Sequence, residues 1–289
     1  IVVADYLNSY YGRLAVARLG SAPDTARRVS GANAALGAGD FSLTAPLPPN
    51  GTVIRALLAE EMFDDAMNEL RYARRLWGDS SAIQATVAWT SQQQARTEKG
   101  MTRFQLMRGG VNAMRRAYPQ FMALGGEDLP RDVLTVIYPV AYWDLIERHS
   151  VANNLDPYLV AALTLQESTF VPDIRSHANA YGLMQLMPAT ARQYARKLKM
   201  TYSSKLLTDP ESNIRMGTAY FADKIREFGS PHLALASYNA GERPVRQWMA
   251  ERPGIDRDEF IDDIPYPQTQ GYVKKVLGTA EDYRRLYPK

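Results

Sequence analysis

Apolar residues recur at helical spacing along most of the 289-residue chain, whereas the alternating pattern of strands is scarce. From Val53 to Trp77 the apolar positions keep a helical period, and similar patterns predict helices over 80–96 and 102–117. Gly100 and Pro119 interrupt the pattern. A succession of amphipathic helices is typical of an α-solenoid or a bundle, which serves mostly as a scaffold.

The stretch from Gly125 to Pro130 is the best candidate for a domain boundary. After it we expect a helix from about Arg131 to His149. Asp156-Pro157 and Asp209-Pro210 are strong helix starts, because aspartate caps the first turn and proline fits the first helical position. The other helices predicted in this half cover 157–168, 188–200, 210–228, 231–239, 242–251 and 269–286. The acidic stretch 256–263 is interpreted as a loop. The sequence therefore predicts an all-α fold.

Glu167 is the strongest chemical candidate. It ends a predicted helix, 157–168, that is apolar on nearly every side and is therefore expected to be buried. A carboxyl group that loses hydration has a raised pKa, so it can stay protonated near neutral pH and act as a general acid. The alternative is a glutamate at a helix end whose carboxyl reaches solvent.

Two later segments carry neutral groups suited to sugars. Residues 182–191 (GLMQLMPATA) and 236–241 (ASYNAG) combine small residues with Gln, Tyr and Asn, which offer hydrogen bonds and ring faces. Taken singly, a methionine pair is typical of core packing and Asn-Ala-Gly is typical of a helix end. The combination is more specific than either part.

Glu167-Ser168, the segments 182–191 and 234–241, and Gly271-Tyr272-Val273 resemble, in order and spacing, the catalytic domain of the soluble lytic transglycosylases. The resemblance covers about 131–289. Weaker motifs upstream are similar to the end of a superhelical domain over 1–50 and to a helical linker domain over 51–130. The resemblance implies a goose-lysozyme-like catalytic domain that acts on strands of alternating N-acetylglucosamine and N-acetylmuramic acid.

The resemblance also implies roles for single residues. Glu167 matches the one catalytic acid and base, Ser176 matches a serine that positions the N-acetyl group or the intermediate, and Tyr272 matches a tyrosine near the carboxyl. Four residues match positions that contact the glycan: Gln185, Met187, Tyr238 and Asn239. Gln268 is a departure, because the best-known members have a glutamate there, and an amide cannot supply its charge.

The expected reaction cleaves the bond between N-acetylmuramic acid and N-acetylglucosamine and leaves 1,6-anhydromuramic ends. No second acid suggests itself near Glu167, which favours attack by the sugar's own 6-hydroxyl group over attack by water. One alternative is a hydrolytic goose-type lysozyme, which uses water. Another is a non-catalytic peptidoglycan-binding helical scaffold.

Composition excludes several other classes. A net charge of +3, without a strong basic bias, argues against a nucleic-acid partner. The absence of cysteine and the wide separation of three histidines argue against a metal site, and we expect no cofactor. There is no apolar run long enough for a transmembrane segment and no signal-peptide pattern at the start, which suggests a mature or truncated product. The resemblance implies a periplasmic location, with peptidoglycan strands and other cell-wall enzymes as partners.

Overall fold

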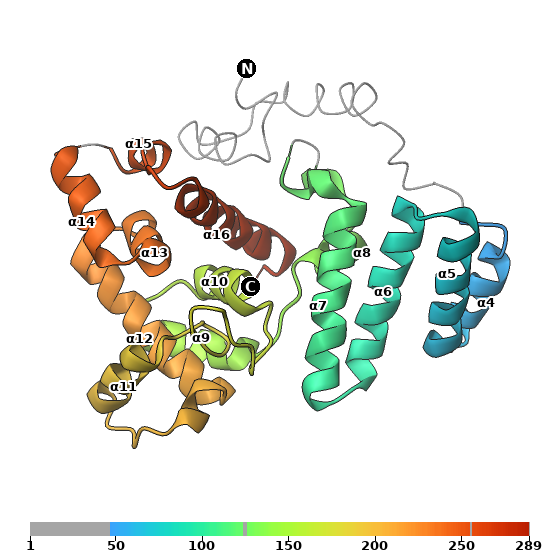
Figure 1. Cartoon of the computed structure of the whole chain (residues 1–289), viewed down its shortest axis with the longest axis horizontal. Coiled ribbons are helices and arrows are strands. Elements are labelled where there is room, and N and C mark those ends of the chain that lie inside the picture. Colours follow the sequence, from blue (N-terminus) through green and yellow to red (C-terminus); the bar gives the residue numbers. More distant parts are fainter. Residues whose placement is uncertain (1–46, 124–125, 255, 289) are drawn as a thin grey trace. The chain divides into compact units, whose positions relative to one another are not determined.

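The computed structural model describes residues 47–123, 126–254 and 256–288 (Figure 1). Within these residues all the regular secondary structure is helical. The only β pairings there are two isolated bridges, Arg175 to Tyr181 and Tyr181 to Leu186. The predicted all-α fold is confirmed. The chain divides into two compact units, and the first ends at Pro139 while the second begins at Val140. None of the described helices combines the length and the apolar character that crossing a bilayer requires.

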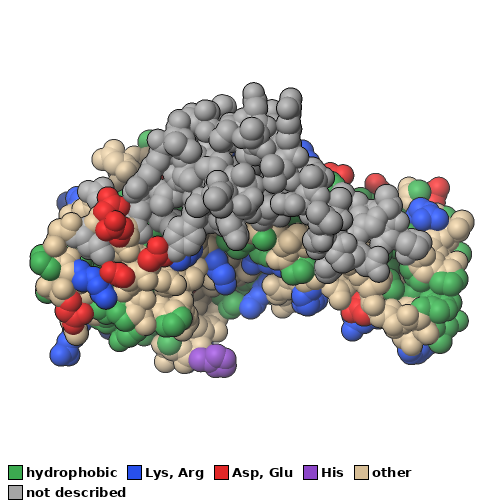
Figure 2. All heavy atoms as spheres, turned by 90° about the horizontal axis from the view of Figure 1, so that it is seen from above, with side chains coloured by type: hydrophobic (Ala, Val, Ile, Leu, Met, Phe, Trp, Pro, Cys, Tyr) green, Lys and Arg blue, Asp and Glu red, His purple; other side chains and the backbone are tan. Residues whose placement is uncertain are grey.

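The first unit is a row of helices in which each packs against the next. They are α4 (Gly51–Ala59), α5 (Phe63–Trp77), α6 (Ser81–Thr97), α7 (Gly100–Ala117) and α8 (Arg131–Ile137). For example, α5 buries Ala66, Leu70 and Ala73. Leu70 and Ala73 form one cluster with Ile54 of α4 and Ile83 of α6. Hydrophobic side chains are also exposed over α4 and α5 (Figure 2), among them Val53, Met62, Tyr72, Leu76 and Trp77.

The contact between α6 and α7 depends on a glycine. A Cβ atom added at Gly110 of α7 would lie 2.9 Å from the carbonyl oxygen of Ala88 in α6. Gly110 is itself buried. Only a residue without a side chain therefore allows the two helix backbones to approach this closely.

Three predictions about single elements are wrong. The helix expected over 53–77 is broken at Glu60–Met62, where Glu61 has a left-handed φ of 56°. The helix expected from Arg131 to His149 is two helices, α8 and α9 (Trp143–Ala152). Pro139 causes this second break, because it has no N–H to donate and disfavours a helical conformation at Tyr138.

The third wrong prediction is the acidic loop 256–263, which contains the short helix α15 (Arg257–Asp262). Phe260 and Ile261 are buried, with 2% and 0% of their surface exposed. Burial of these two apolar side chains stabilises a helical turn that the surrounding acidic residues do not favour.

The second unit is built around the buried helix α10 (Pro157–Ser168), which packs against α9 and against α16 (Pro267–Leu286). The other helices of this unit are α11 (Pro188–Lys197), α12 (Pro210–Phe228), α13 (Pro231–Ala240) and α14 (Glu242–Glu251). The two Asp-Pro starts are confirmed. The Asp156 side chain accepts a hydrogen bond from the Tyr158 backbone N–H, and Asp209 accepts one from Ser212.

The sequence predicts domain limits after residues 50 and 130, and the structure divides the chain after Pro139. Residues 1–50, predicted as the end of a superhelical domain, lie almost entirely outside the described residues. The linker domain over 51–130 and the catalytic domain over 131–289 stay predictions.

Candidate active site

Helix α10 carries Glu167 to the interior of the second unit. Seven of its residues from Leu159 to Leu165 are buried, so the helix has no solvated face until its last turn. Thr169, with a left-handed φ of 52°, ends the helix directly after Ser168. The carboxyl group therefore stands at the end of a buried helix, where the chain turns away.

The carboxyl group of Glu167 is partly withdrawn from water. Burial raises its pKa from 4.5 to about 7. The hydroxyl group of Tyr272 on α16 donates a hydrogen bond to Oε1 of Glu167, which acts in the opposite direction and lowers the pKa. Burial and the charge of Glu167 in turn raise the pKa of Tyr272, so its hydroxyl remains a donor. A carboxyl group in this setting holds its proton near neutral pH and can give it to a substrate.

Glu167 faces a pocket of about 450 Å³, a size typical of small-molecule sites. The pocket is lined by residues of α10, α13 and α16: Gln166, Glu167, Asn239, Pro267, Gln268, Gly271, Tyr272 and Lys275. Four residues singled out from the sequence meet here: Glu167, Asn239, Gln268 and Tyr272. Asn239 is held in place, since its Oδ1 accepts a hydrogen bond of 2.8 Å from Thr269.

The other four residues singled out from the sequence do not line this pocket. Tyr238 donates a 2.6 Å hydrogen bond to the carbonyl oxygen of Met184. Gln185 has a left-handed φ of 46°, and its side chain donates to the carbonyl oxygens of Gly182 and Ile174. These contacts hold the loop that follows α10.

Met187 and Ser176 belong to the same loop. Met187 is 43% exposed and caps the start of α11. Ser176 accepts a hydrogen bond from the Ala180 backbone N–H through its Oγ. Both lie on the same segment as Gln185, and neither is among the residues that line the pocket.

Asn213 on α12 is a structural residue that the sequence patterns did not single out. Its amide group donates to the carbonyl oxygens of Tyr181 and Leu207, and its oxygen accepts from the Met184 N–H. Gly182, with φ of 77°, comes so close that an added Cβ would lie 2.4 Å from Asn213 Nδ2. The sequence indicates this role only through the position of Asn213, a polar residue beside the apolar stripe of α12.

A buried cation fixes the beginning of α14. Lys224 on α12 is 5% exposed and donates to Glu227 (2.6 Å) and to Glu242, the first residue of α14. Its ammonium group also lies 5.6 Å from the centre of the Tyr220 ring. The contact joins α12 to the corner that follows Asn239, so it helps to hold one wall of the pocket.

Two further residues of the pocket were not predicted as site residues: Gly271, which was noted only as part of a motif, and Lys275. Together with Gln268 and Tyr272 they are spaced at i, i+3, i+4 and i+7 along α16, which places all four on one helix face. This spacing was readable from the sequence once Tyr272 had been chosen. Within the described ranges, no three acidic or histidine side chains gather into a potential metal site.

Residues 144–261 match the family model of the transglycosylase SLT domain. The chain is 38% identical, over 157 residues, to the soluble lytic murein transglycosylase of Escherichia coli K12, covering 53% of this chain and 24% of that protein. It is 31% identical to the endo-type membrane-bound lytic murein transglycosylase A of an Enterobacter species, covering 45% of this chain and 75% of that protein. The chain thus spans about a quarter of the length of the soluble relatives that it matches.

Solved structures give the same likeness over nearly the whole chain. An inactive mutant of the lytic transglycosylase Slt from Pseudomonas aeruginosa is 27% identical, with a TM-score of 0.65, and covers 96% of this chain and 41% of its own. The 70 kDa soluble lytic transglycosylase of Escherichia coli has the same identity and TM-score, with 97% of this chain covered.

Proposed function

The chain belongs to the family of lytic transglycosylases with an SLT domain, and from this premise we propose that it cleaves peptidoglycan strands between N-acetylmuramic acid and N-acetylglucosamine. One observation carries the proposal: a single carboxyl group, Glu167, with a pKa of about 7, faces an open pocket and receives a hydrogen bond from Tyr272. On this view residues 131–289 are the catalytic domain and 51–130 are a linker domain. The enzyme acts in the periplasm, where its substrate lies.

In the first step Glu167 gives its proton to the glycosidic oxygen as the bond from that oxygen to the anomeric carbon breaks. The N-acetyl carbonyl group of the muramic acid stabilises the cationic sugar. The Tyr272 hydroxyl stabilises the carboxylate that forms on Glu167, because it already donates to Oε1.

In the second step the Glu167 carboxylate takes the proton of the 6-hydroxyl group on the same sugar. The oxygen closes on the anomeric carbon, which gives a 1,6-anhydromuramic end and restores the protonated acid. An attacking group within the same molecule has a high effective concentration, so water competes poorly. Glu167 is also the only carboxyl group among the residues that line the pocket in the described ranges, which leaves no partner to activate water.

Six further residues are proposed to contact or position the glycan. Asn239 and Gln268 do so from the pocket itself. Ser176, Gln185, Met187 and Tyr238 do so from or beside the loop after α10.

Digestion of purified sacculi followed by mass spectrometry tests the proposal. A transglycosylase releases anhydro ends, which are lighter by one water than the products of hydrolysis. Glu167→Gln keeps the shape of the side chain but cannot donate the proton, so turnover should fall at least about a thousandfold.

Glu60→Gln removes an exposed glutamate from the first unit and is the matched control. Products that carry the added water would replace the proposed reaction with hydrolysis. Substantial turnover by Glu167→Gln would reject the role of this residue.

A further inference from the structure

One face of α16 forms a continuous wall of the pocket. Its four residues differ sharply in chemistry: an amide at Gln268, an open space at Gly271, a hydroxyl at Tyr272 and a cation at Lys275. Of these four residues, only Tyr272 is hydrogen-bonded to Glu167. The rest of this face is therefore available to a ligand.

Gly271 leaves room that no other described residue occupies. A Cβ atom added there would meet nothing within 4 Å, and its backbone is ordinary helix, so neither packing nor a left-handed φ requires glycine. In a helix interior, glycine is less stable than alanine by about 1 kcal/mol. The open space beside Tyr272 is consistent with a bound group that approaches the α16 backbone.

Lys275 lies one turn beyond that space. Among the described residues it forms no ion pair, in contrast to its neighbour Lys274, whose ammonium group lies 2.9 Å from Asp262. Glu167 is the only residue in the pocket lining whose charge opposes that of Lys275, and the amide at Gln268 adds none. When Glu167 is protonated, the pocket carries one positive charge that faces no carboxylate of the protein.

We propose that Lys275 binds a carboxylate on the substituent of the muramic acid residue, while that sugar occupies the space over Gly271. The inference rests on the proposed function and adds the recognition of an acidic group to it. Two sources offer the same chemistry: the lactyl carboxylate of peptide-free glycan and the carboxylates of an attached peptide. Neutral strands of the same length lack the contact and bind more weakly.

Binding measured in the Glu167→Gln protein tests this without cleavage. Calorimetry compares peptide-bearing strands, peptide-free strands with free lactyl carboxylates, and peptide-free strands whose carboxylates are converted to neutral methylamides. Lys275→Met should lower the preference for an acidic strand over the neutral one by about fivefold, which is the strength of a solvent-exposed ion pair. Lys275→Arg should restore most of that preference.

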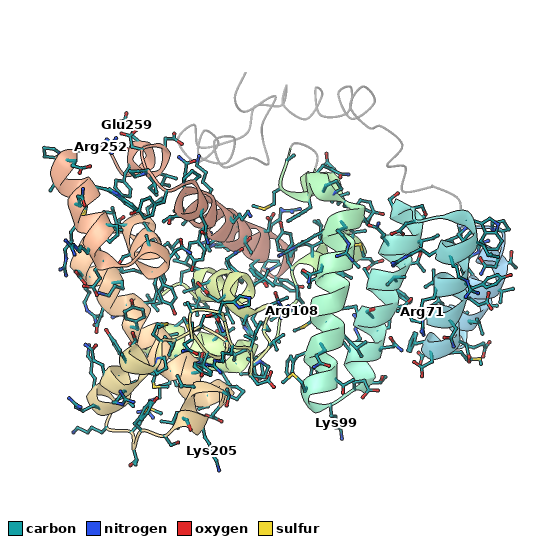
Figure 3. All side chains as sticks on the ribbon, in the orientation of Figure 1. Arg71, Lys99, Arg108, Lys205, Arg252 and Glu259 are labelled. Atoms are coloured by element: carbon teal, nitrogen blue, oxygen red, sulfur yellow. The ribbon has the colours of Figure 1, made fainter. Side chains whose placement is uncertain are left out.

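Lys205→Met is the charge-matched control, because Lys205 is exposed and projects from the opposite end of the second unit to α16 (Figure 3). This variant should keep the parent's preference. Loss confined to peptide-bearing strands identifies the peptide as the source. Loss confined to peptide-free acidic strands identifies the lactyl carboxylate, which is an uncharged amide once a peptide is attached, and loss on both acidic strands shows that Lys275 binds either carboxylate. An unchanged preference in Lys275→Met overturns the inference, whereas failure of the wild-type protein to cleave sacculi is a separate result that rejects the proposed function.

Discussion

Gly110 in α7 and Gly271 in α16 both lie inside a long helix, where glycine is unfavourable, but their surroundings are opposite. At Gly110 the neighbouring helix fills the space, since an added Cβ would lie 2.9 Å from a backbone oxygen. At Gly271 the space is empty and opens to a pocket. The first glycine serves helix packing, and the second leaves room for something that is not part of the protein.

The two units also differ in the kinds of side chain that they bury. The charged side chains that are most deeply buried in the described ranges, Lys224 and Asp282, both belong to the second unit. The first unit buries mainly aliphatic stripes such as the one on α5. A unit that buries charge and leaves a cavity is less stable than it could be, and four experiments test this contrast between the units.

The largest expected effect is the pH dependence of stability that Glu167 causes. Its folded pKa of about 7 lies above the usual 4.5, so its contribution to stability is fully present below pH 4.5 and is lost as pH rises through 7. Glu167→Gln lacks this titration and should gain about 3 kcal/mol relative to the wild type between these limits. Urea unfolding at pH 4 and pH 8 measures the difference, and an equal gain in Glu60→Gln would contradict it.

Gly271→Ala should lower kcat/KM by about a hundredfold, because the methyl group displaces the sugar from its position beside Glu167. The same change should raise the free energy of unfolding by about 0.5–1 kcal/mol through helix propensity. The matched control is Gly109→Ala in α7, which also meets nothing within 4 Å but lies in the first unit. Full activity in Gly271→Ala would show that the open space is not used.

Gly110→Ala should destabilise the protein by about 2 kcal/mol, since the added carbon is forced against the Ala88 carbonyl oxygen. Thermal or urea unfolding of this variant beside Gly109→Ala isolates the steric effect from helix propensity. If both variants were equally stable, α6 and α7 would not depend on a close contact at Gly110.

The smallest expected effect is a shift in a pH profile. The hydrogen bond from Tyr272 lowers the pKa of Glu167, so Tyr272→Phe should raise it. Because the acid must be protonated to act, the alkaline limb of kcat/KM, expected near pH 7, should move to higher pH. Tyr158→Phe removes a hydroxyl that donates to Tyr287 at the other end of α10 and should leave the limb in place. If the alkaline limb does not move in Tyr272→Phe, the hydrogen bond from Tyr272 does not set the pH dependence of kcat/KM.

The helix starts and the buried helix were predictable because their signals are local. Asp156-Pro157 defines its own cap, and an all-apolar helix has nowhere to lie but the core. The break at Pro139 was also local, but the apolar period continues across it and obscured it. Phe260 and Ile261 were hidden among acidic residues, because only tertiary contact shows that they are buried.

The candidate site was predictable only in part. Glu167 could be singled out from its own helix, but the Tyr272 hydroxyl that bonds to it lies 105 residues away in sequence. No local pattern specifies such a pairing, so Tyr272 came from the resemblance to a family. Lys275 follows from the helical spacing of α16 only after the register of that helix is known.

The packing of α10 against α16 shows that the candidate site extends beyond the segment that matches the family model. The family match ends at residue 261, before α16 begins at Pro267. A polypeptide trimmed to that match would keep Glu167 and lose five of the eight residues that line the pocket, Tyr272 among them. A fragment chosen for expression should therefore include the residues that contact Glu167, even where they lie beyond the end of the family match.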